Sequence, residues 1–237
     1  MVITWVTREG GRAVNEDAVG KSRAKGIVCV VVSDGLGGHS GGRIASELTV
    51  NTILESFNNN PGFTKEHLSQ YINDARNKVM DKAIEDPDLL YMSSTAVVLL
   101  IKGRRAMWAS VGDSRLYRIE NGEICEVTED NSIAFLDFAN GDIEYDDIRK
   151  SPNQNKLTSA VGVSMDIVNY SDMCKINSST VFLICTDGWW VHVNEEEMES
   201  TLKTSKNARH WLQKMIEIRN EKAPEDSDNY TAAIVMC

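Results

Sequence analysis

The sequence has no excess of positive charge and no long apolar run. Its 237 residues include 25 Lys and Arg against 35 Asp and Glu, so the formal net charge is −10. A chain this acidic is poorly suited to nucleic acid or to an anionic membrane surface, and we expect neither as a partner. No apolar stretch approaches the ~20 residues that a membrane-spanning helix needs. An anionic substrate remains compatible with this charge, because bound metal ions can reverse the local potential.

Paired cysteine motifs are also missing. The five cysteines are odd in number and show no Cys-x-x-Cys spacing, so neither a disulfide framework nor a zinc knuckle is indicated. Cys29 and Cys185 lie inside apolar runs, where a thiol packs like a small hydrophobic side chain. Residues 1–6 have neither a basic region nor a long apolar region of the kind found in signal peptides. We therefore expect a cytoplasmic protein.

The sequence does contain buried strands that end at an acid. Six apolar residues, Ile27–Val32, predict a strand buried on both faces, and it is followed by Ser33-Asp34-Gly35-Leu36-Gly37-Gly38-His39. The apolar run at 181–185 ends similarly in Thr186-Asp187-Gly188. An acid at the end of a buried strand is costly unless it is solvated or meets a cation. Two such strands predict two carboxylates brought to one place.

The rest of the chain reads as helix pairs separated by meandering strands. Apolar spacing predicts helices at 43–57 and 64–85, the second with Thr64 as its N-cap, and later at 195–202 and 206–221. Turn signals at Lys102-Gly103-Arg104-Arg105 and Asn121-Gly122 predict antiparallel hairpins between the pairs. Strands are predicted at 2–7, 12–21, 27–32, 95–101, 106–111, 116–119, 124–127, 170–176, 180–185 and 230–236. This order predicts an α+β fold of two mainly antiparallel sheets flanked by helices.

The chain is expected to form a single domain over residues 1–237. This length is large for one domain but within the usual range, and no repeat, low-complexity tract or long linker divides it. Residues from about 128 to 156 are acidic, irregular and weakly apolar. We predict that they form an excursion over the sheet edge with one or two short helices, called the flap segment below.

Four acids stand at the ends of apolar strands beside small or turn residues. A lone Asp-Gly pair is usually a turn or a helix cap, but four acids placed alike indicate a cluster. If they converge, each close pair repels by about 4 kcal/mol at an effective dielectric constant near 20. Raised pKa values or bound cations would then be needed, and oxygen ligands favour Mg²⁺ or Mn²⁺. The four acids are Asp34, Asp113, Asp187 and Asp228.

Seven short sequence blocks, which include these acids, together resemble one known family, the metal-dependent protein phosphatases of type 2C in their compact bacterial form. The matching blocks occur in the family's order and span nearly the whole chain. They are residues 12–18 (RAVNEDA), 33–39 (SDGLGGH), 94–96 (STA), 111–115 (VGDSR), 155–162 (NKLTSAVG), 185–188 (CTDG) and 228–231 (DNYT). The resemblance implies a catalytic domain built as a four-layer α-β-β-α sandwich, with two Mn²⁺ or Mg²⁺ ions at one end of the sheets.

The resemblance also implies a set of metal ligands. Asp34 corresponds to the aspartate that bridges both metals, with the Gly35 carbonyl as a neighbouring ligand. Asp187 and Asp228 correspond to the other ligands of the first metal. The early acidic pair, Glu16 and Asp17, corresponds to residues that bind the second metal directly or through its waters, and the sequence does not decide which acid ligates directly. A weaker third metal is held in the family by the equivalents of Asp113 and Asp187.

The activity implied by the resemblance is hydrolysis of phosphoserine and phosphothreonine in proteins by a metal-activated water. Arg12 and Asp34 would be catalytic, since Arg12 corresponds to the arginine that grips the substrate phosphate. The implied partners are phosphoproteins modified by a serine/threonine kinase in signalling, and we expect a monomer. The alternative is a weak or inactive relative that acts as a phosphoprotein-binding or sensor module, which the intact acids disfavour. A nucleotide-binding glycine loop at 35–38 is disfavoured because no Gly-Lys-Ser/Thr follows.

Some residues differ from those of the family, and the role of others is not decided by the sequence. The sequence does not decide whether His39 is a general acid or a turn residue before the next helix. Asn131 and Ser151 stand in the flap segment where many relatives have histidine, which places the difference in substrate specificity. For Trp189 and Trp190, we predict packing in the core or under the flap segment rather than contact with a phosphopeptide.

Overall fold

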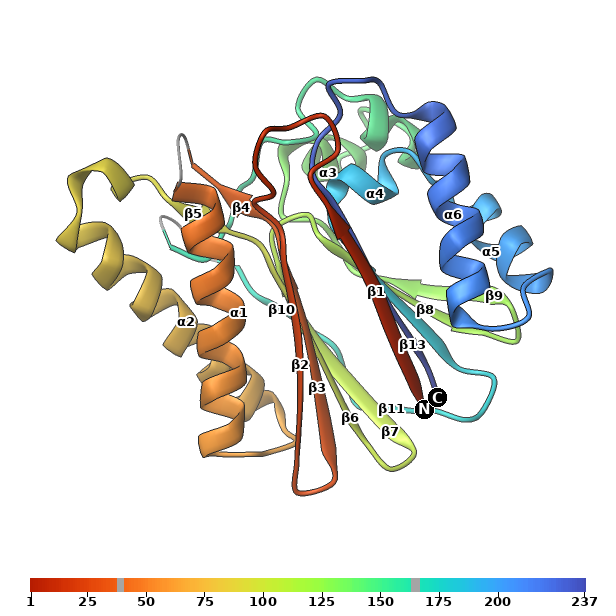
Figure 1. The fold of residues 1–237 in the computed structure, drawn as a ribbon, viewed down its shortest axis with the longest axis horizontal. Helices are drawn as coiled ribbons and strands as arrows, with labels where there is room; N and C mark the ends of the chain where they lie inside the picture. The colour runs from red at the N-terminus through yellow and green to blue at the C-terminus, as the bar shows by residue number, and fades with distance from the viewer. Residues whose placement is uncertain (38–40, 163–166) are drawn as a thin grey trace.

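Two antiparallel β-sheets stacked face to face form the centre of the molecule (Figure 1). The computed structural model describes residues 1–37, 41–162 and 167–237. The first sheet has the order β1 (Val2–Arg8), β13 (Tyr230–Met236), β12 (Val181–Cys185), β8 (Arg115–Glu120) and β9 (Glu123–Val127). The second has the order β10 (Asn169–Tyr170), β7 (Arg105–Val111), β6 (Ala96–Lys102), β3 (Ile27–Ser33) and β2 (Ala18–Ala24), and β11 (Cys174–Lys175) also pairs with β7.

Each sheet is covered on its outer face by one pair of helices (Figure 1). Helices α1 (Gly41–Asn59) and α2 (Lys65–Glu85) lie over the second sheet, and α5 (Glu195–Lys203) and α6 (Ala208–Lys222) lie over the first. The predicted N-cap of α2 is confirmed, because Thr64 Oγ1 accepts a hydrogen bond from the backbone N–H of His67. The predicted α+β fold of two sheets between helix pairs is therefore confirmed.

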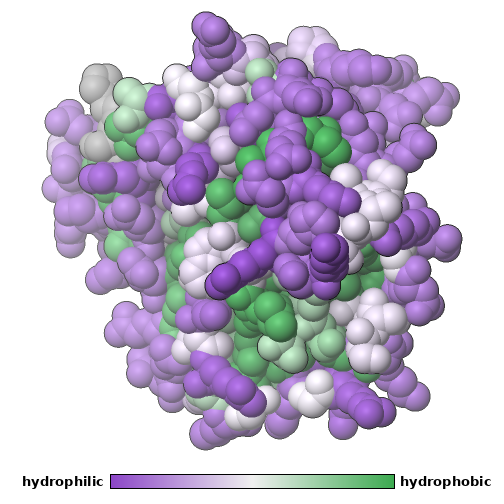
Figure 2. Space-filling view, turned by 45° about the vertical axis from the view of Figure 1, so that its right-hand side comes forward, coloured by the Kyte–Doolittle hydropathy of each residue, from purple (hydrophilic) through white to green (hydrophobic). Residues whose placement is uncertain are grey.

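Strand β3 explains why the chain needs a continuous apolar run. Successive side chains of a strand point to opposite faces. Ile27, Cys29 and Val31 pack toward the helices α1 and α2, and the alternate valines at 28, 30 and 32 pack between the two sheets. Every residue of β3 is buried. On the face shown in Figure 2, hydrophilic residues predominate toward the top and right, and apolar residues show between them in the lower centre.

The flap segment contains two short helices, α3 (Ile133–Ala139) and the 3-10 helix η2 (Tyr145–Lys150). Four further short elements are α4 (Asp187–Trp190), the 3-10 helix η1 (Pro87–Leu89) and the paired strands β4 (Gly35–Leu36) and β5 (Ser93–Ser94). In the described part of the chain, no helix is both long enough and apolar enough to cross a membrane.

Two predicted strands differ in the structure, and one residue of open role lies outside the described residues. The continuous strand at 170–176 is wrong: Ser171-Asp172-Met173 separates β10 from β11, and Ser171 Oγ accepts the backbone N–H of Trp108 at 2.8 Å. The strand predicted from residue 12 begins only at Ala18, because residues 9–16 form a loop tied to Asn229. His39, whose role was open, lies outside the described residues.

Candidate active site

A cavity of 490 Å³ collects the predicted site residues at one end of the two sheets. Asp34 follows β3, Asp113 follows β7 and Asp187 follows β12, so the ends of three strands supply three carboxylates. Of the predicted site residues, only Asp17 is not part of the lining, and it lies buried next to it. The lining consists of Arg12, Ala13, Val14, Glu16, Asp34, Gly35, Leu36, Gly37, Asp113, Asn155, Asp187 and Asp228.

The backbone of Asp34 is held by Thr95. The N–H of Asp34 donates to Thr95 Oγ1 and the N–H of Thr95 donates to the Asp34 carbonyl, each at 2.8 Å. The following residue has to be glycine, because a Cβ at Gly35 would lie 2.0 Å from the carbonyl oxygen of Gly42. These contacts fix the turn that places Asp34 and Gly35 at the cavity.

Asp17 and Asp187 come from opposite sheets and are joined through Thr186. Thr186 Oγ1 donates to Asp17 Oδ2 at 2.9 Å, and it accepts the backbone N–H of Thr231 at 3.0 Å. Gln154 of the flap segment donates to Asp187 Oδ2 at 3.1 Å. The remaining oxygens, Asp17 Oδ1 and Asp187 Oδ1, are buried and find no hydrogen-bond donor among the described residues. Two buried carboxylate oxygens are therefore available for another ligand.

The rim of the cavity holds the basic residue. Arg12 Nη2 lies 3.2 Å from Asp228 Oδ2, and both side chains are about half exposed. Asn229 fixes the loop that carries Arg12, because its side chain accepts the N–H of Glu16 and donates to the carbonyls of Glu9 and Val14. Arg12 is the only basic residue among the described residues that line the cavity.

The carboxylates of the cavity destabilise one another. Burial raises the pKa of Asp34 well above its ordinary value, and the charges of Asp17, Asp187 and Asp113 raise it further. Burial likewise raises the pKa of Asp17 to about 7, despite the hydrogen bond from Thr186. The pKa of Asp113 is raised by burial first and by Asp187 second. A cluster of this kind holds protons or binds a cation.

The chemistry of these donors fits a hard divalent cation. The available ligands are carboxylate and carbonyl oxygens, which Mg²⁺ and Mn²⁺ prefer, and two of the buried oxygens have no donor. Within the residues that the structure describes, no three His, Cys, Asp or Glu side chains form a closed ligand set around one point. Since Mg²⁺ keeps several of its waters, a site of this type needs few protein ligands.

The packing role predicted for the two tryptophans is confirmed. Trp189 and Trp190 are fully buried, and Trp190 Nε1 donates to the carbonyl of Asp113 at 2.9 Å. Asn131, at a position where many relatives have histidine, exchanges hydrogen bonds with the backbone of Gly112. Ser151, the other such position, accepts the N–H of Asn153. Both flap-segment residues hold backbone in place.

Three residues near the cavity were missed from the sequence. Gln154 reaches Asp187, Asn155 lines the cavity, and Asn229 organises the loop at 9–16. Asn155 and Asn229 stand in the blocks that carry the family resemblance, which was the available signal. Nothing in the spacing around Gln154 distinguishes it from other polar residues of the flap segment.

The sequence as a whole matches a family description. Residues 7–229 match the family model described as Protein phosphatase 2C. The chain belongs to the protein phosphatase 2C family. The predicted resemblance is thereby confirmed, and so is the expectation of a phosphoprotein phosphatase at the level of the family.

Bacterial serine/threonine phosphatases are similar to this chain over most of its length. The serine/threonine phosphatase stp of Listeria welshimeri is 28% identical over 211 residues, which are 87% of this chain and 83% of that protein. The crystal structure of the Mycobacterium tuberculosis phosphatase PstP/Ppp has a TM-score of 0.87 at 23% identity, covering 98% of this chain and 97% of that one. The PstP catalytic domain in complex with two manganese ions has a TM-score of 0.81 at 23% identity, covering 98% and 96%.

Proposed function

We propose that this chain is a metal-dependent protein serine/threonine phosphatase. It would hydrolyse phosphoserine and phosphothreonine with a water activated by two Mn²⁺ or Mg²⁺ ions. The single observation that carries the proposal is the meeting of Asp34, Asp113 and Asp187 in one cavity that has one basic residue at its rim. The two manganese ions of the PstP complex support the choice of metal.

The proposed ligands follow the positions of the carboxylates. Asp34 would bridge the two ions, with the Gly35 carbonyl beside it, and Asp187 and Asp228 would complete the first site. The second site would use the acidic pair at 16–17, in which Glu16 faces the cavity and Asp17 is buried behind it. A weaker third ion is proposed at Asp113, whose carboxylate shares the cavity with Asp187.

Ions bound there would supply a water of lowered pKa and would neutralise charge on the phosphate. The protein's own residues then perform the remaining tasks. Arg12 orients the phosphate, because its planar guanidinium can donate to two phosphate oxygens at once. Asp34 is held in place by its backbone bonds to Thr95, so the carboxylate needs no reorganisation during the reaction. No cysteine lies among the described lining residues, which fits direct attack by water.

The test is an assay of the purified protein on a phosphothreonine peptide and on p-nitrophenyl phosphate. We expect activity with Mn²⁺ that disappears with EDTA and returns when Mn²⁺ is added in excess. Calorimetric titration with Mn²⁺ in the same buffer reports binding independently of turnover. Activity that is indifferent to chelation, or no activity despite bound metal, would contradict the proposal and favour the phosphoprotein-binding module.

We further propose that residues 1–237 form one catalytic domain that acts as a cytoplasmic monomer. Its substrates would be phosphoproteins made by a serine/threonine kinase. The flap segment at 128–156 would face the substrate, since its residues Gln154 and Asn155 already reach the cavity. A molar mass of one chain, 26.4 kDa, in light scattering would support the monomer.

A further inference from the structure

A buried indole links helix α4 to the Asp113 turn. Trp190 is fully buried, and its Nε1–H donates to the main-chain carbonyl of Asp113 at 2.9 Å. The bond is made to the backbone, so it fixes the turn between β7 and β8 without engaging the carboxylate of Asp113, a residue that lines the cavity. A buried indole N–H needs an acceptor, and Asp113 supplies it.

Arg115 holds the indole from its other side. The guanidinium carbon lies 3.5 Å from the centroid of the Trp190 ring, and the side chain of Arg115 is only 2% exposed. Asp130 binds the same guanidinium with two bonds, Nε to Oδ1 at 2.9 Å and Nη2 to Oδ2 at 2.7 Å. Burial lowers the pKa of Arg115, but the charge and hydrogen bonds of Asp130 together with the neighbouring Tyr117 and Tyr145 outweigh it, and the net shift is upward. The cation over the ring therefore stays charged.

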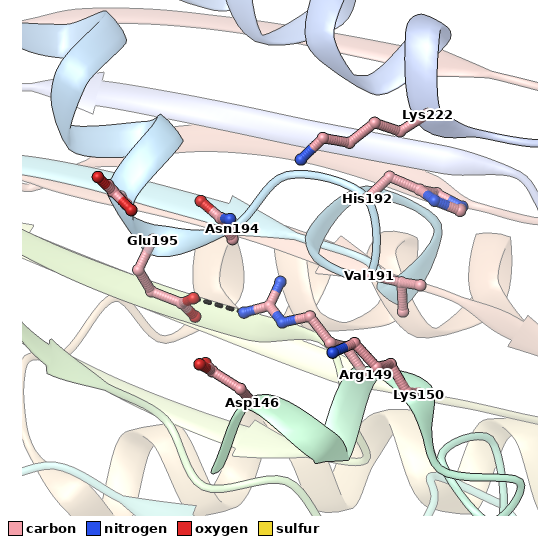
Figure 3. Close-up of a pocket in the computed structure, with 9 residues that line it drawn as sticks. Asp146, Arg149, Lys150, Val191, His192, Asn194, Glu195 and Lys222 are labelled. Atoms are coloured by element: carbon pink, nitrogen blue, oxygen red, sulfur yellow. Dashed lines mark hydrogen bonds and ion pairs between the residues drawn. The ribbon is translucent and has the colours of Figure 1, made fainter.

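The flap segment reaches the backbone of Trp190 through Arg149. One guanidinium nitrogen of Arg149 donates to the carbonyl of Trp190 and another pairs with Glu195, as the dashed line in Figure 3 shows for the pair. Glu195 in turn lies 3.8 Å from Arg115 Nη1 and accepts the hydroxyl of Tyr145 at 3.2 Å. An unbroken series of polar contacts thus runs from η2 through α4 to Asp113.

The space around Arg149 allows this contact to change. Arg149 and Glu195 line a second cavity of 430 Å³, distinct from the one that holds the acids (Figure 3). Lys222 and His192 line the same cavity. Because a cavity adjoins it, the Arg149 side chain can leave the Trp190 carbonyl without displacing close-packed neighbours.

We propose that Trp190 is a positioning residue for Asp113 and that Arg149 of the flap segment holds Trp190 in place. The contact between η2 and α4 then sets how tightly Asp113 binds its cation. This inference rests on the proposed function in one respect, namely that Asp113 takes part in binding the weakest of the divalent ions.

The test compares Mn²⁺ binding by the wild-type chain and Trp190→Phe in calorimetric titrations. Phenylalanine keeps an aromatic face for Arg115 and removes the donor to Asp113. We expect the dissociation constant of the weakest Mn²⁺ site to rise about fivefold, because one neutral hydrogen bond contributes about 1 kcal/mol. The tighter Mn²⁺ sites should be unchanged. Turnover on p-nitrophenyl phosphate should fall at low Mn²⁺ and recover at high Mn²⁺.

Trp211→Phe is the matched control. Trp211 is also fully buried and its Nε1 donates to a carbonyl, that of Met198 at 3.0 Å, but it lies between α5 and α6 away from the acids. We expect it to leave all Mn²⁺ steps unchanged. If both variants weaken Mn²⁺ binding equally, or if Trp190→Phe weakens none of the steps, the positioning role is overturned.

Arg149→Gln tests the second half of the proposal. We expect the same weak Mn²⁺ step to weaken by about twofold to fivefold, the range of a partial to a full hydrogen bond. Lys150→Gln, which removes the same charge one residue along η2, should leave it unchanged. Equal effects of the two variants, or none from Arg149→Gln, would overturn control by the flap segment. A wild-type chain that binds no Mn²⁺ would overturn the proposed function itself.

Discussion

Buried acids occur in two settings within this molecule. Asp130 lies at the start of the flap segment, and its carboxylate receives two hydrogen bonds from Arg115. Asp113 and Asp17 are buried to a similar degree, 4% and 7% exposed against 5% for Asp130, but the charges that act on them most strongly are those of other carboxylates. A buried aspartate is therefore paired with an opposite charge at Asp130, whereas Asp113 and Asp17 are repelled by charges of the same sign.

The contrast shows that the fold can place a buried arginine beside a buried acid, and that it does not do so for the acids of the cavity. Around Asp130, a fully buried arginine supplies the partner. In the cavity, Arg12 remains at the exposed rim on Asp228. A paired buried acid is needed for stability, because losing one partner leaves an uncompensated charge. Clustered unpaired acids instead lower stability and favour cation binding.

The largest expected effect is on catalysis. Asp187→Asn removes a proposed metal ligand and a mutually repelling charge together. We expect turnover on a phosphothreonine peptide to fall about a thousandfold, roughly 4 kcal/mol, while the metal-free protein is at least as stable as wild type. Steady-state assays in Mn²⁺ and urea unfolding in EDTA measure the two effects. Wild-type turnover in this variant would refute the ligand assignment.

Asp130→Asn should have the opposite pattern. It removes the carboxylate that binds Arg115 with two bonds and leaves this buried guanidinium only the longer contact with Glu195 at 3.8 Å. We expect the free energy of unfolding to fall by about 3 kcal/mol. The measurement is the urea midpoint at unchanged m-value. If Asp187→Asn costs as much stability in EDTA as Asp130→Asn does, the distinction between the paired and unpaired acids is wrong.

Arg12→Lys tests whether the arginine at the rim of the cavity binds the substrate phosphate. Lysine keeps the charge but loses the planar pair of donors, so we expect kcat/KM to fall about tenfold on a phosphopeptide. Arg8→Lys is the control, since Arg8 is exposed and contacts only the adjacent Thr7 carbonyl among the hydrogen bonds described. Unchanged kinetics for Arg12→Lys would remove Arg12 from phosphate binding.

The smallest expected effect is a pH dependence of the metal-free protein. Burial raises the pKa of Asp17 from its ordinary 3.8 to about 7, so the folded chain holds a proton that the unfolded chain releases. Stability is therefore present at low pH and is lost as pH rises through this range. We expect the Tm in EDTA to fall by roughly 4 °C between pH 6 and pH 8, corresponding to about 1.4 kcal/mol. Asp17→Asn should flatten the decline, and a Tm that rises with pH would contradict it.

The sequence predicted the fold well where local patterns carry the information. The valine-rich run of β3 needs burial on both faces, and Thr64 caps α2 through its own side chain. The strand ends at Asp34 and Asp187 were also readable, because each pairs an apolar run with a glycine turn. Local patterns could not show that Arg115 meets Asp130 or that Gln154 meets Asp187, since those contacts depend on tertiary packing. The break at Ser171 likewise depends on its bond to Trp108.

The carboxylates of the cavity are anchored on different layers of the sandwich. Asp34 continues β3 of one sheet, and Asp187 continues β12 of the other. Apolar contacts between the sheets resist separation but have little directional preference, so they oppose sliding only weakly. An ion shared by Asp34 and Asp187 would link the two sheets and oppose their sliding past each other. Catalytic geometry and resistance to shear would then depend on the same bond.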